Sequence, residues 1–320
     1  MIVVVALNPA LDITHQVAGA NWAGVNRPFA VHARAGGKGL NVARTLRALG
    51  QHVTLTGLAG GLTGQALLDG LNGTGILAAL TPIAGETRRT FTVADSVSGQ
   101  TALFNEPGPA VTEGEYHEFF VAYEKALASS QVVVLSGSLP RGVPTSTYAA
   151  LIAAAAGAGV PAVLDASGPA LIRGAAAGPA LVKPNLAELE AVVGHGLRAA
   201  GAPDLPAVER AARVLAGPGS TVVVSLGPDG LLAVGPEATW HARPPGHVAG
   251  NPTGAGDAVV AGLADSLVRG HDWPATLRHA VALGTAAAGA PAAGEFAAGD
   301  YDRLVPTVEV TGAAVGPEQG

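Results

Sequence analysis

Short apolar runs and longer amphipathic stretches alternate along most of the chain. The apolar runs predict strands at Ile2–Leu7, His52–Thr56, Val132–Ser136, Ala162–Asp165, Leu181–Lys183 and Thr221–Leu226. Between them, apolar side chains recur with helical spacing, which predicts helices over Leu40–Leu49, Gly64–Leu71, Glu113–Leu127, Ser146–Ala156, Ala187–Val193 and Ala207–Leu215. This alternation indicates an α/β fold, a three-layer αβα sandwich around a mostly parallel central sheet.

Two segments break the alternation. Residues 12–34 and 88–105 alternate polar and apolar positions with a period of two, and no helical pattern follows them. We expect these segments to form a small β-sheet lid on a single domain that spans residues 1–305. A helical, Ala-rich region follows Pro274, and the Gly/Pro-rich, acidic tail over 306–320 is expected to be frayed.

Composition narrows the class of protein. Hydrophobic residues make up 48% of the 320 residues, which is enough for a large buried core. The net charge of -6 and the absence of a Lys/Arg cluster argue against a nucleic-acid partner. The chain has no Cys, which excludes disulfides and thiolate metal sites. No basic leader precedes the first apolar run, and no run reaches the roughly 18 apolar residues of a membrane span. We therefore expect a cytoplasmic protein without a membrane partner.

The strongest motif is Asn251-Pro-Thr-Gly-Ala-Gly-Asp257, which opens a helical pattern over Ala258–Val268. Backbone amides at a Gly-rich helix start point toward one spot at the positive end of the helix dipole. Gly254, Ala255 and Gly256 are therefore predicted to form an anion hole. The carboxylate of Asp257 at the same helix start can accept the proton of an attacking hydroxyl. Taken alone, the motif is equally typical of an Asp that caps a helix.

A second Gly-rich motif, Ala35-Gly-Gly-Lys-Gly-Leu-Asn-Val-Ala43, also opens a helix. Its glycines allow a ligand to approach the backbone, Lys38 adds a cation, and Asn41 both donates and accepts hydrogen bonds. The motif is not a Walker A loop, because Gly rather than Ser or Thr follows Lys38. The chain has only three lysines, and this motif and the next contain two of them.

The third motif is Lys183-Pro-Asn185-Leu-Ala-Glu188. Asn185 and Glu188 are three residues apart at a helix start and share one face, where they could hold waters on Mg²⁺. A capping box, in which these two residues satisfy the first backbone amides of the helix, explains the pattern equally well.

Weaker signals lie in loops that follow predicted strands. Ser136-Gly-Ser-Leu-Pro140 and Ser225-Leu-Gly-Pro-Asp-Gly230 are small polar loops of this kind. Near the lid, Arg27, Arg88 and Arg89 offer planar guanidinium groups suited to a phosphate. The chain has neither the dinucleotide-binding fingerprint after its first strand nor a Gly-x-Ser-x-Gly elbow, which disfavours a nicotinamide-dependent oxidoreductase and an α/β-hydrolase.

Taken together, the motifs resemble those of the ribokinase-like (PfkB) carbohydrate kinases. The match runs in order from Ala6-Leu-Asn-Pro-Ala-Leu-Asp12 through Gly36-Gly-Lys-Gly and Lys183-Pro-Asn to Gly254-Ala-Gly-Asp257, and it covers nearly the whole chain. Asn105-Glu-Pro-Gly-Pro109 and Gly85-Glu-Thr-Arg88 resemble the branch of 1-phosphofructokinases and tagatose-6-phosphate kinases. That branch usually carries Asn and then Lys on the lid strand after Arg88, whereas this chain has Thr90 and Thr92.

The resemblance implies a role for each matching residue. Asp12, Gly37 and Asn41 would hold sugar hydroxyls, and Arg27, Lys38, Arg88 and Ser138 would lie near the phosphate already on the substrate. Lys183, Asn185 and Glu188 would serve the ATP phosphates and Mg²⁺, the latter through water. Ser225, Gly227 and Gly230 would line the nucleotide site. Gly254, Ala255 and Gly256 would form the anion hole, with Asp257 as the catalytic base.

The resemblance also implies an activity. It is the transfer of a phosphoryl group from ATP to a sugar phosphate, with fructose 1-phosphate as the expected acceptor and fructose 1,6-bisphosphate and ADP as products. Tagatose 6-phosphate and fructose 6-phosphate remain alternative acceptors, and a non-catalytic sugar-phosphate sensor is the alternative of another class. By analogy with the family, a homodimer formed through the lid is expected.

Overall fold

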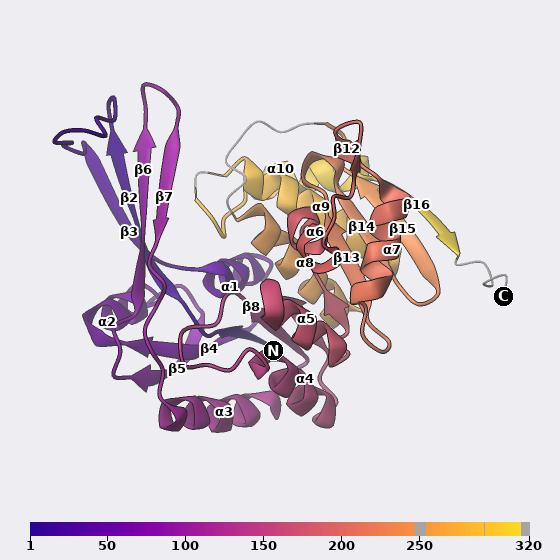
Figure 1. Ribbon diagram of the computed structural model, residues 1–320, viewed down its shortest axis with the longest axis horizontal. Helices are drawn as coiled ribbons and strands as arrows, with labels where there is room; N and C mark the ends of the chain where they lie inside the picture. Colours follow the sequence, from indigo (N-terminus) through magenta and orange to yellow (C-terminus); the bar gives the residue numbers. More distant parts are fainter. Residues whose placement is uncertain (247–253, 291, 315–320) are drawn as a thin grey trace.

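The computed structural model describes residues 1–246, 254–290 and 292–314 (Figure 1). Within these residues, a ten-stranded sheet has the order β16-β15-β14-β13-β10-β9-β8-β1-β4-β5. Its strands are β1 (Ile2–Ala6), β4 (Val53–Gly60), β5 (Leu77–Ile83), β8 (Val132–Ser136), β9 (Ala162–Asp165), β10 (Leu181–Val182), β13 (Thr221–Ser225), β14 (Leu231–Val234), β15 (Ala238–Arg243) and β16 (Glu309–Ala314). All neighbouring strands from β5 to β13 are parallel, and β14, β15 and β16 add antiparallel strands at one end.

Helices cover both faces of this sheet, which confirms the predicted fold class. The helices are α1 (Lys38–Ala48), α2 (Gly61–Asp69), α3 (Glu113–Leu127), α4 (Thr147–Gly157), α5 (Gly168–Ala176), α6 (Leu186–Val193), α7 (Leu205–Leu215), α8 (Ala255–Arg269), α9 (Trp273–Ala288) and α10 (Ala298–Leu304), with short 3₁₀ turns at Gly227–Asp229 and Val305–Thr307. Side chains of α3–α7 pack in one hydrophobic cluster, and those of α1, α2, α8 and α9 pack in another.

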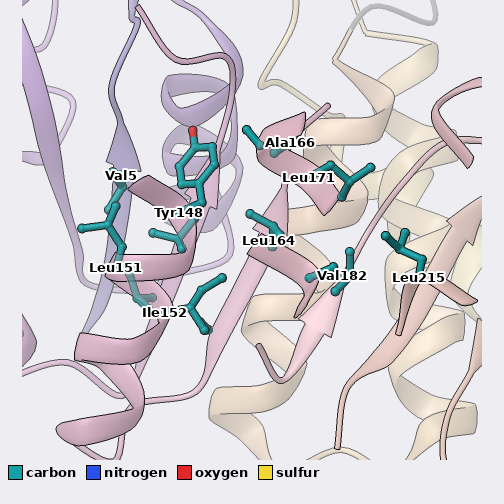
Figure 2. Packing of buried hydrophobic residues seen from close by; sticks show 14 of the residues in the cluster. Val5, Tyr148, Leu151, Ile152, Leu164, Ala166, Leu171, Val182 and Leu215 are labelled. Atoms are coloured by element: carbon teal, nitrogen blue, oxygen red, sulfur yellow. The ribbon is translucent and has the colours of Figure 1, made fainter. Parts of the chain in front are cut away.

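The central strand β1 shows why the sheet is buried on both sides. Val3 and Val5 point into the first cluster, whereas Ile2 and Val4 point into the second, and all four side chains are fully buried. A continuous β-branched run is typical of a parallel strand with helices on both faces. Figure 2 shows part of the first cluster, which contains Val5 of β1 and Tyr148 and Leu151 of α4.

A second, four-stranded sheet projects from one end of the main body (Figure 1). Its order is β3-β2-β6-β7, with β2 (Ala10–Val17), β3 (Ala30–Gly36), β6 (Arg88–Asp95) and β7 (Thr101–Asn105). The chain enters it twice, between β1 and α1 and again between β5 and α3. These two excursions account for the segments in which the strand–helix alternation fails. A short hairpin of β11 (Arg198–Ala199) and β12 (Ala202–Pro203) lies elsewhere.

The expectation of a frayed tail is wrong for Glu309–Ala314. These residues form β16, which pairs antiparallel with β15 from Glu309 opposite Arg243 to Ala314 opposite Ala238. Val308 is buried just before the strand, and Val310 packs against the second hydrophobic cluster. The alternation of apolar and polar residues around Val308 and Val310 is a strand pattern that the Gly/Pro-rich composition of the tail concealed.

The strand order places a switch point at β1. From β1 the chain builds one side of the sheet through β4 and β5, and then returns to the other side of β1 through β8, β9, β10 and β13. Ligands of such sheets bind beyond the carboxyl ends of the strands at this reversal. At this position Asn8, which follows β1, donates a hydrogen bond of 3.0 Å to Ser138 Oγ, which follows β8.

Candidate active site

A cleft of about 1300 Å³ lies between the carboxyl edge of the central sheet and the four-stranded sheet. Most residues predicted from the sequence line it, although they come from segments far apart in the chain. They are Asp12, Gly37, Lys38, Asn41, Arg88, Ser138, Lys183, Asn185, Ser225, Gly227, Gly230, Gly254, Ala255, Gly256 and Asp257. Of the candidate site residues named in the sequence analysis, Arg27, Arg89 and Glu188 do not line it.

The amino end of α8 forms one corner of the cleft. Gly254 adopts a left-handed conformation with φ of 89°, and a Cβ there would approach Ala293 Cα to 2.8 Å, so both the turn and the space require glycine. The first intrahelical bond runs from Ala258 N to Gly254 O, which leaves the preceding amides directed out of the helix start. Asn251–Thr253, the beginning of the motif, lie outside the described residues.

Asp257 lies in the first turn of α8 and is only 7% exposed. Its Oδ2 accepts a hydrogen bond of 2.9 Å from Asn41 Nδ2 on α1. Burial and, after it, the charge of Asp165 raise the pKa of Asp257 to about 7, while the Asn41 hydrogen bond and the charges of Lys38 and Lys183 act in the opposite direction. Near neutral pH this carboxyl group therefore exchanges a proton readily, as a general base must.

Asp165, which the sequence analysis did not single out, lies at the centre of the charged groups. It is the last residue of β9 and is 1% exposed. Lys183 Nζ lies 3.1 Å from its Oδ1 and Lys38 Nζ 3.4 Å from its Oδ2, and Ser136 Oγ donates a hydrogen bond of 3.1 Å to Oδ2. Although burial acts to raise the pKa of Asp165, the two lysines and the hydroxyl hold it below the usual value. Asp165 is therefore an ionised carboxylate between two ammonium groups.

The third motif forms the capping box that its spacing predicts. Asn185 caps α6 by accepting a hydrogen bond of 2.8 Å from Glu188 N, and Glu188 Oε2 accepts one of 2.9 Å from Asn185 N. The capping box is therefore present. The other carboxylate oxygen of Glu188 lies outside the box, 4.0 Å from Lys38 Nζ. The side-chain oxygen of Asn185 is already used as a cap, so Glu188 has the freer oxygen for a hydrated cation.

Asp12 lies on β2, on the side of the cleft formed by the four-stranded sheet. A Cβ on Gly36 would lie 1.8 Å from Asp12 Oδ2, so this carboxylate occupies the space that the missing side chain leaves on the neighbouring strand β3. The Asp12 carboxylate faces the cleft beside the start of α1. An acceptor of hydrogen bonds at this place suits sugar hydroxyl groups.

Arg88 is the first residue of β6 and lines the cleft. Its Nε donates a hydrogen bond of 3.1 Å to Asn8 O, and Nη1 lies 3.5 Å from Glu106 O. Burial lowers the pKa of Arg88, against the charges of Asp12 and Glu106. Backbone oxygens therefore fix the guanidinium, which lines the cleft beside Ser138.

The alternation of side chains along β6 decides which of the lid residues reach the cleft. Thr90 and Thr92 line it with Arg88. Arg89 points to the other face, where it pairs with Glu106 at 2.8 Å and lies over the ring of Phe91. Arg89 therefore does not replace the lysine that the resembling branch carries on this strand.

The structure does not bring Arg27 to the cleft. Arg27 is exposed in the connection between β2 and β3, at the far end of the four-stranded sheet.

Two other arginines line the cleft although no sequence motif indicated them. Arg34 on β3 pairs with Glu295 at 2.9 Å, and Arg44 on α1 donates to Ala35 O. Burial and the charge of Arg34 lower the pKa of Arg44 to about 10.

The remaining wall combines small polar loops with an apolar surface. Ser225 ends β13, and its amide donates to Pro184 O at 3.0 Å, which joins this loop to the third motif. Gly227 begins the 3₁₀ turn that follows, and Gly230 comes directly after it. Apolar side chains of Leu231, Val259 and Val281 continue the wall. An apolar wall beside polar loops suits a nucleoside base and its phosphates.

Comparisons with known proteins agree with this arrangement. Residues 5–297 match the model of the pfkB family of carbohydrate kinases. A 1-phosphofructokinase of Rhodobacter capsulatus is 38% identical over 290 residues, which cover 90% of each chain. The chain therefore belongs to the pfkB family of carbohydrate kinases. No described helix has the length and apolar character that crossing a bilayer requires.

Solved structures agree with both the family and the fold. The phosphofructokinase-2 of Escherichia coli in complex with fructose-6-phosphate is 31% identical, with a TM-score of 0.83 over 95% of this chain and 98% of that one. The tetrameric inhibited form of the same enzyme gives a TM-score of 0.84 with the same coverage. A ribokinase of Arabidopsis thaliana, 20% identical with a TM-score of 0.70 over 95% of this chain and 98% of that one, shares the fold.

Proposed function

We propose that this protein transfers the γ-phosphoryl group of ATP to the free primary hydroxyl of fructose 1-phosphate. The observation that carries the proposal is the buried carboxyl group of Asp257 at the amino end of α8, opposite Lys38 and Lys183. The similarity to the 1-phosphofructokinase of Rhodobacter capsulatus supports the choice of acceptor. The acceptor oxygen bonds to the γ-phosphorus, the bond to the bridging oxygen of ADP breaks, and the hydroxyl proton is transferred to Asp257.

Asp257 acts as the general base in this reaction. Its pKa of about 7 leaves it largely ionised in weakly alkaline solution, while it remains more basic than an ordinary carboxylate. The hydrogen bond from Asn41 fixes the carboxylate against α1 and leaves its second oxygen for the acceptor hydroxyl. The base therefore acts from a rigid position between two helices.

The amides at the start of α8 stabilise the transferred group. Phosphoryl transfer requires little covalent work from the protein, and charge neutralisation supplies most of the catalysis. Amides that precede the first helical hydrogen bond, together with the positive end of the helix dipole, stabilise negative charge in the water-excluded cleft. Lys38 lies beside the acceptor phosphate together with Arg88, and Lys183 lies beside the phosphates of ATP.

Mg²⁺ fits the donor set at the start of α6. Glu188 presents one carboxylate oxygen that the capping box does not use, and Mg²⁺ usually retains several waters and few protein ligands. Glu188 would hold the ion through water, with Asn185 orienting Glu188 by the cap. When bound, the ion neutralises charge on the phosphates of ATP.

The four-stranded sheet has two faces with different roles. Its inner positions, which include Thr14, Thr90 and Thr92, are polar and face the cleft, where they help to exclude water from the reacting phosphate. Its outer face carries exposed apolar side chains, among them Val31 and Phe104, each 55% exposed. An apolar sheet face of this kind suits pairing with the same face of a second copy. We therefore include a homodimer through this sheet in the proposal.

Two alternatives are tested with the same assay. Fructose 6-phosphate and tagatose 6-phosphate carry their phosphate on C6 and would present the C1 hydroxyl to Asp257 instead of the C6 hydroxyl. A non-catalytic sugar-phosphate sensor would bind sugar phosphate without turnover. A sensor needs neither a base of raised pKa nor the charged groups on the ATP side, which favours the kinase.

The test is ADP release from magnesium ATP with fructose 1-phosphate, fructose 6-phosphate, tagatose 6-phosphate or free fructose, with Asp257→Asn as the blank. We expect the highest kcat/KM with fructose 1-phosphate and its loss in the variant. A higher kcat/KM with a 6-phosphate would mean that the protein is a kinase but that its acceptor is that 6-phosphate rather than fructose 1-phosphate. Sugar-phosphate binding without ADP release from any of the four sugars would refute the kinase and favour the sensor.

A further inference from the structure

Three adjacent strand ends place Asp165 between groups that the proposed reaction uses. Ser136 of β8 is the register partner of Asp165, and Gly137 N donates to Asp165 O at 3.0 Å. On the other side, Lys183 N donates to Leu164 O at 2.9 Å, so the chain after β10 continues alongside β9. Parallel strands end at one edge of the sheet, and backbone pairing therefore fixes Asp165 between Ser136 and Lys183.

The two lysines come to Asp165 from different parts of the chain. Lys183 follows β10 and has a side chain that is only 4% exposed, whereas Lys38 starts α1 and is 43% exposed. Two ammonium groups so close to one site repel each other unless a carboxylate lies between them. Asp165 supplies that carboxylate and itself remains buried.

Asp257 is a second buried carboxyl group with which Lys38 and Lys183 could form ion pairs. Both lysines act on Asp257 electrostatically, although neither is within ion-pair distance of it, whereas both lie within 3.4 Å of Asp165. We propose that Asp165 is a positioning residue, which holds Lys38 and Lys183 beside the two phosphate groups and keeps them from pairing with Asp257. This inference rests on the proposed role of Asp257 as the base.

The inference makes a prediction about pH. The groups that face Asp257 are Asn41 and Lys38 from α1, Lys183 after β10, and Asp165 from β9. Loss of the negative charge at Asp165 removes a group that raises the pKa of Asp257 and releases two cations that lower it. The base then ionises at lower pH, and it is also weaker because a lysine pairs with it.

The first experiment is the pH profile of kcat/KM for Asp165→Asn. We expect the acid limb to move down by about one pH unit or more, and kcat/KM at pH 8 to fall roughly 10–100-fold, the scale of residues that orient catalytic groups. Asp165→Glu, which retains the charge, should return the limb toward that of the wild type. An acid limb of Asp165→Asn that coincides with the wild-type limb would overturn the inference.

The same profiles separate this inference from the proposed function. A wild-type acid limb that persists in Asp257→Asn would refute Asp257 as the base, whatever Asp165 does. If Asp257→Asn abolishes the acid limb of the pH profile but Asp165→Asn does not shift it, only the role of Asp165 is refuted.

Discussion

The two walls of the cleft hold their charges in different ways. On the edge of the central sheet, Asp165, Lys183 and Asp257 are each at most 7% exposed, and every one of them lies beside a named partner. On the four-stranded sheet, Asp12 and Arg88 are only half-buried, and the next inner positions of β6 are the neutral Thr90 and Thr92. Buried charges need fixed partners, whereas half-buried ones keep some contact with water.

Under the proposed function, this difference separates the residues that carry out the phosphoryl transfer from those that select the acceptor. The strand ends and the start of α8 are locked by backbone pairing, which suits a base and an anion hole that must not move. The inner face of the small sheet is a row of side chains with a period of two, so one substitution changes the surface that the acceptor meets without disturbing the core. Substitutions at the carboxyl edge of the central sheet should therefore change mainly kcat, and substitutions on the four-stranded sheet should change mainly KM.

The largest effect is expected for Asp257→Asn. Because the amide cannot accept the proton, kcat should fall roughly 10²–10⁴-fold with little change in KM for either substrate. Steady-state kinetics at pH 8 measure both quantities. Near-normal turnover would show that Asp257 is not the base. It would also contradict the assignment of catalysis to the wall formed by the central sheet.

The same variant should be more stable than the wild type in alkaline solution. The native pKa of Asp257 is raised, so the wild type loses stability as the pH rises through about 7, whereas below pH 4 the carboxyl group is protonated in both states. The gain in the free energy of unfolding has an upper limit of about 4 kcal/mol at pH 8, from about 1.4 kcal/mol per pKa unit. Urea unfolding at pH 8 and pH 5 tests this, and a gain of the same size at both pH values would contradict it.

The next effect in size is expected for Arg88→Ala. Loss of a charge-assisted hydrogen bond to the acceptor phosphate should weaken binding by about 1.5–3 kcal/mol, seen as a higher KM for the sugar phosphate. Arg89→Ala is the matched control, because Arg89 lies on the same strand and points to the other face. An equal rise of KM in the two variants would mean that the small sheet responds as a whole and not through its inner face.

The pH dependence of the wild type gives a smaller, graded effect. In the proposed reaction Asp257 must be ionised, and it is protonated below its pKa of about 7, so kcat/KM should fall about tenfold for each pH unit below that value. The measurement uses a saturating concentration of magnesium ATP between pH 5 and pH 9. A profile that is flat down to pH 5 would place the pKa of the base in the ordinary range for a carboxyl group.

The sequence predicted more of the sheet edge than of the small sheet. The strands Val132–Ser136 and Ala162–Asp165 are confirmed at both ends, because each is an apolar run that ends in a polar residue, a pattern typical of a buried parallel strand. Asp165 was nevertheless missed, since one Asp at the end of an apolar run has no motif around it. Its importance appears only when β8, β9 and β10 are aligned.

The small sheet was predicted as a segment but not residue by residue. Arg27 was predicted because it is a guanidinium near the lid in a chain that resembles the family, whereas in the structure it lies in an exposed connection outside the cleft. Arg34 and Arg44, which do line the cleft, belong to no motif, and their approach depends on the pairing of β2 with β3 and on the angle of α1. Strand register and helix placement are long-range properties that a local pattern does not encode.

The smallest effect is expected when a cation is returned to the inner face of the small sheet. Thr92→Lys places an ammonium group on the cleft side of β6, and Val93→Lys places the same group on the outer face as the matched control. Because position 92 is only half-buried and keeps contact with water, the gain in binding of the sugar phosphate should be about 0.2–1 kcal/mol, and 0.5 M salt should abolish it. Kinetics at low and high salt measure the change in KM. A lower KM in Thr92→Lys alone would show that the inner face of β6 can select the acceptor. Equal changes of KM in both variants would show instead that only the net charge of the protein affects binding.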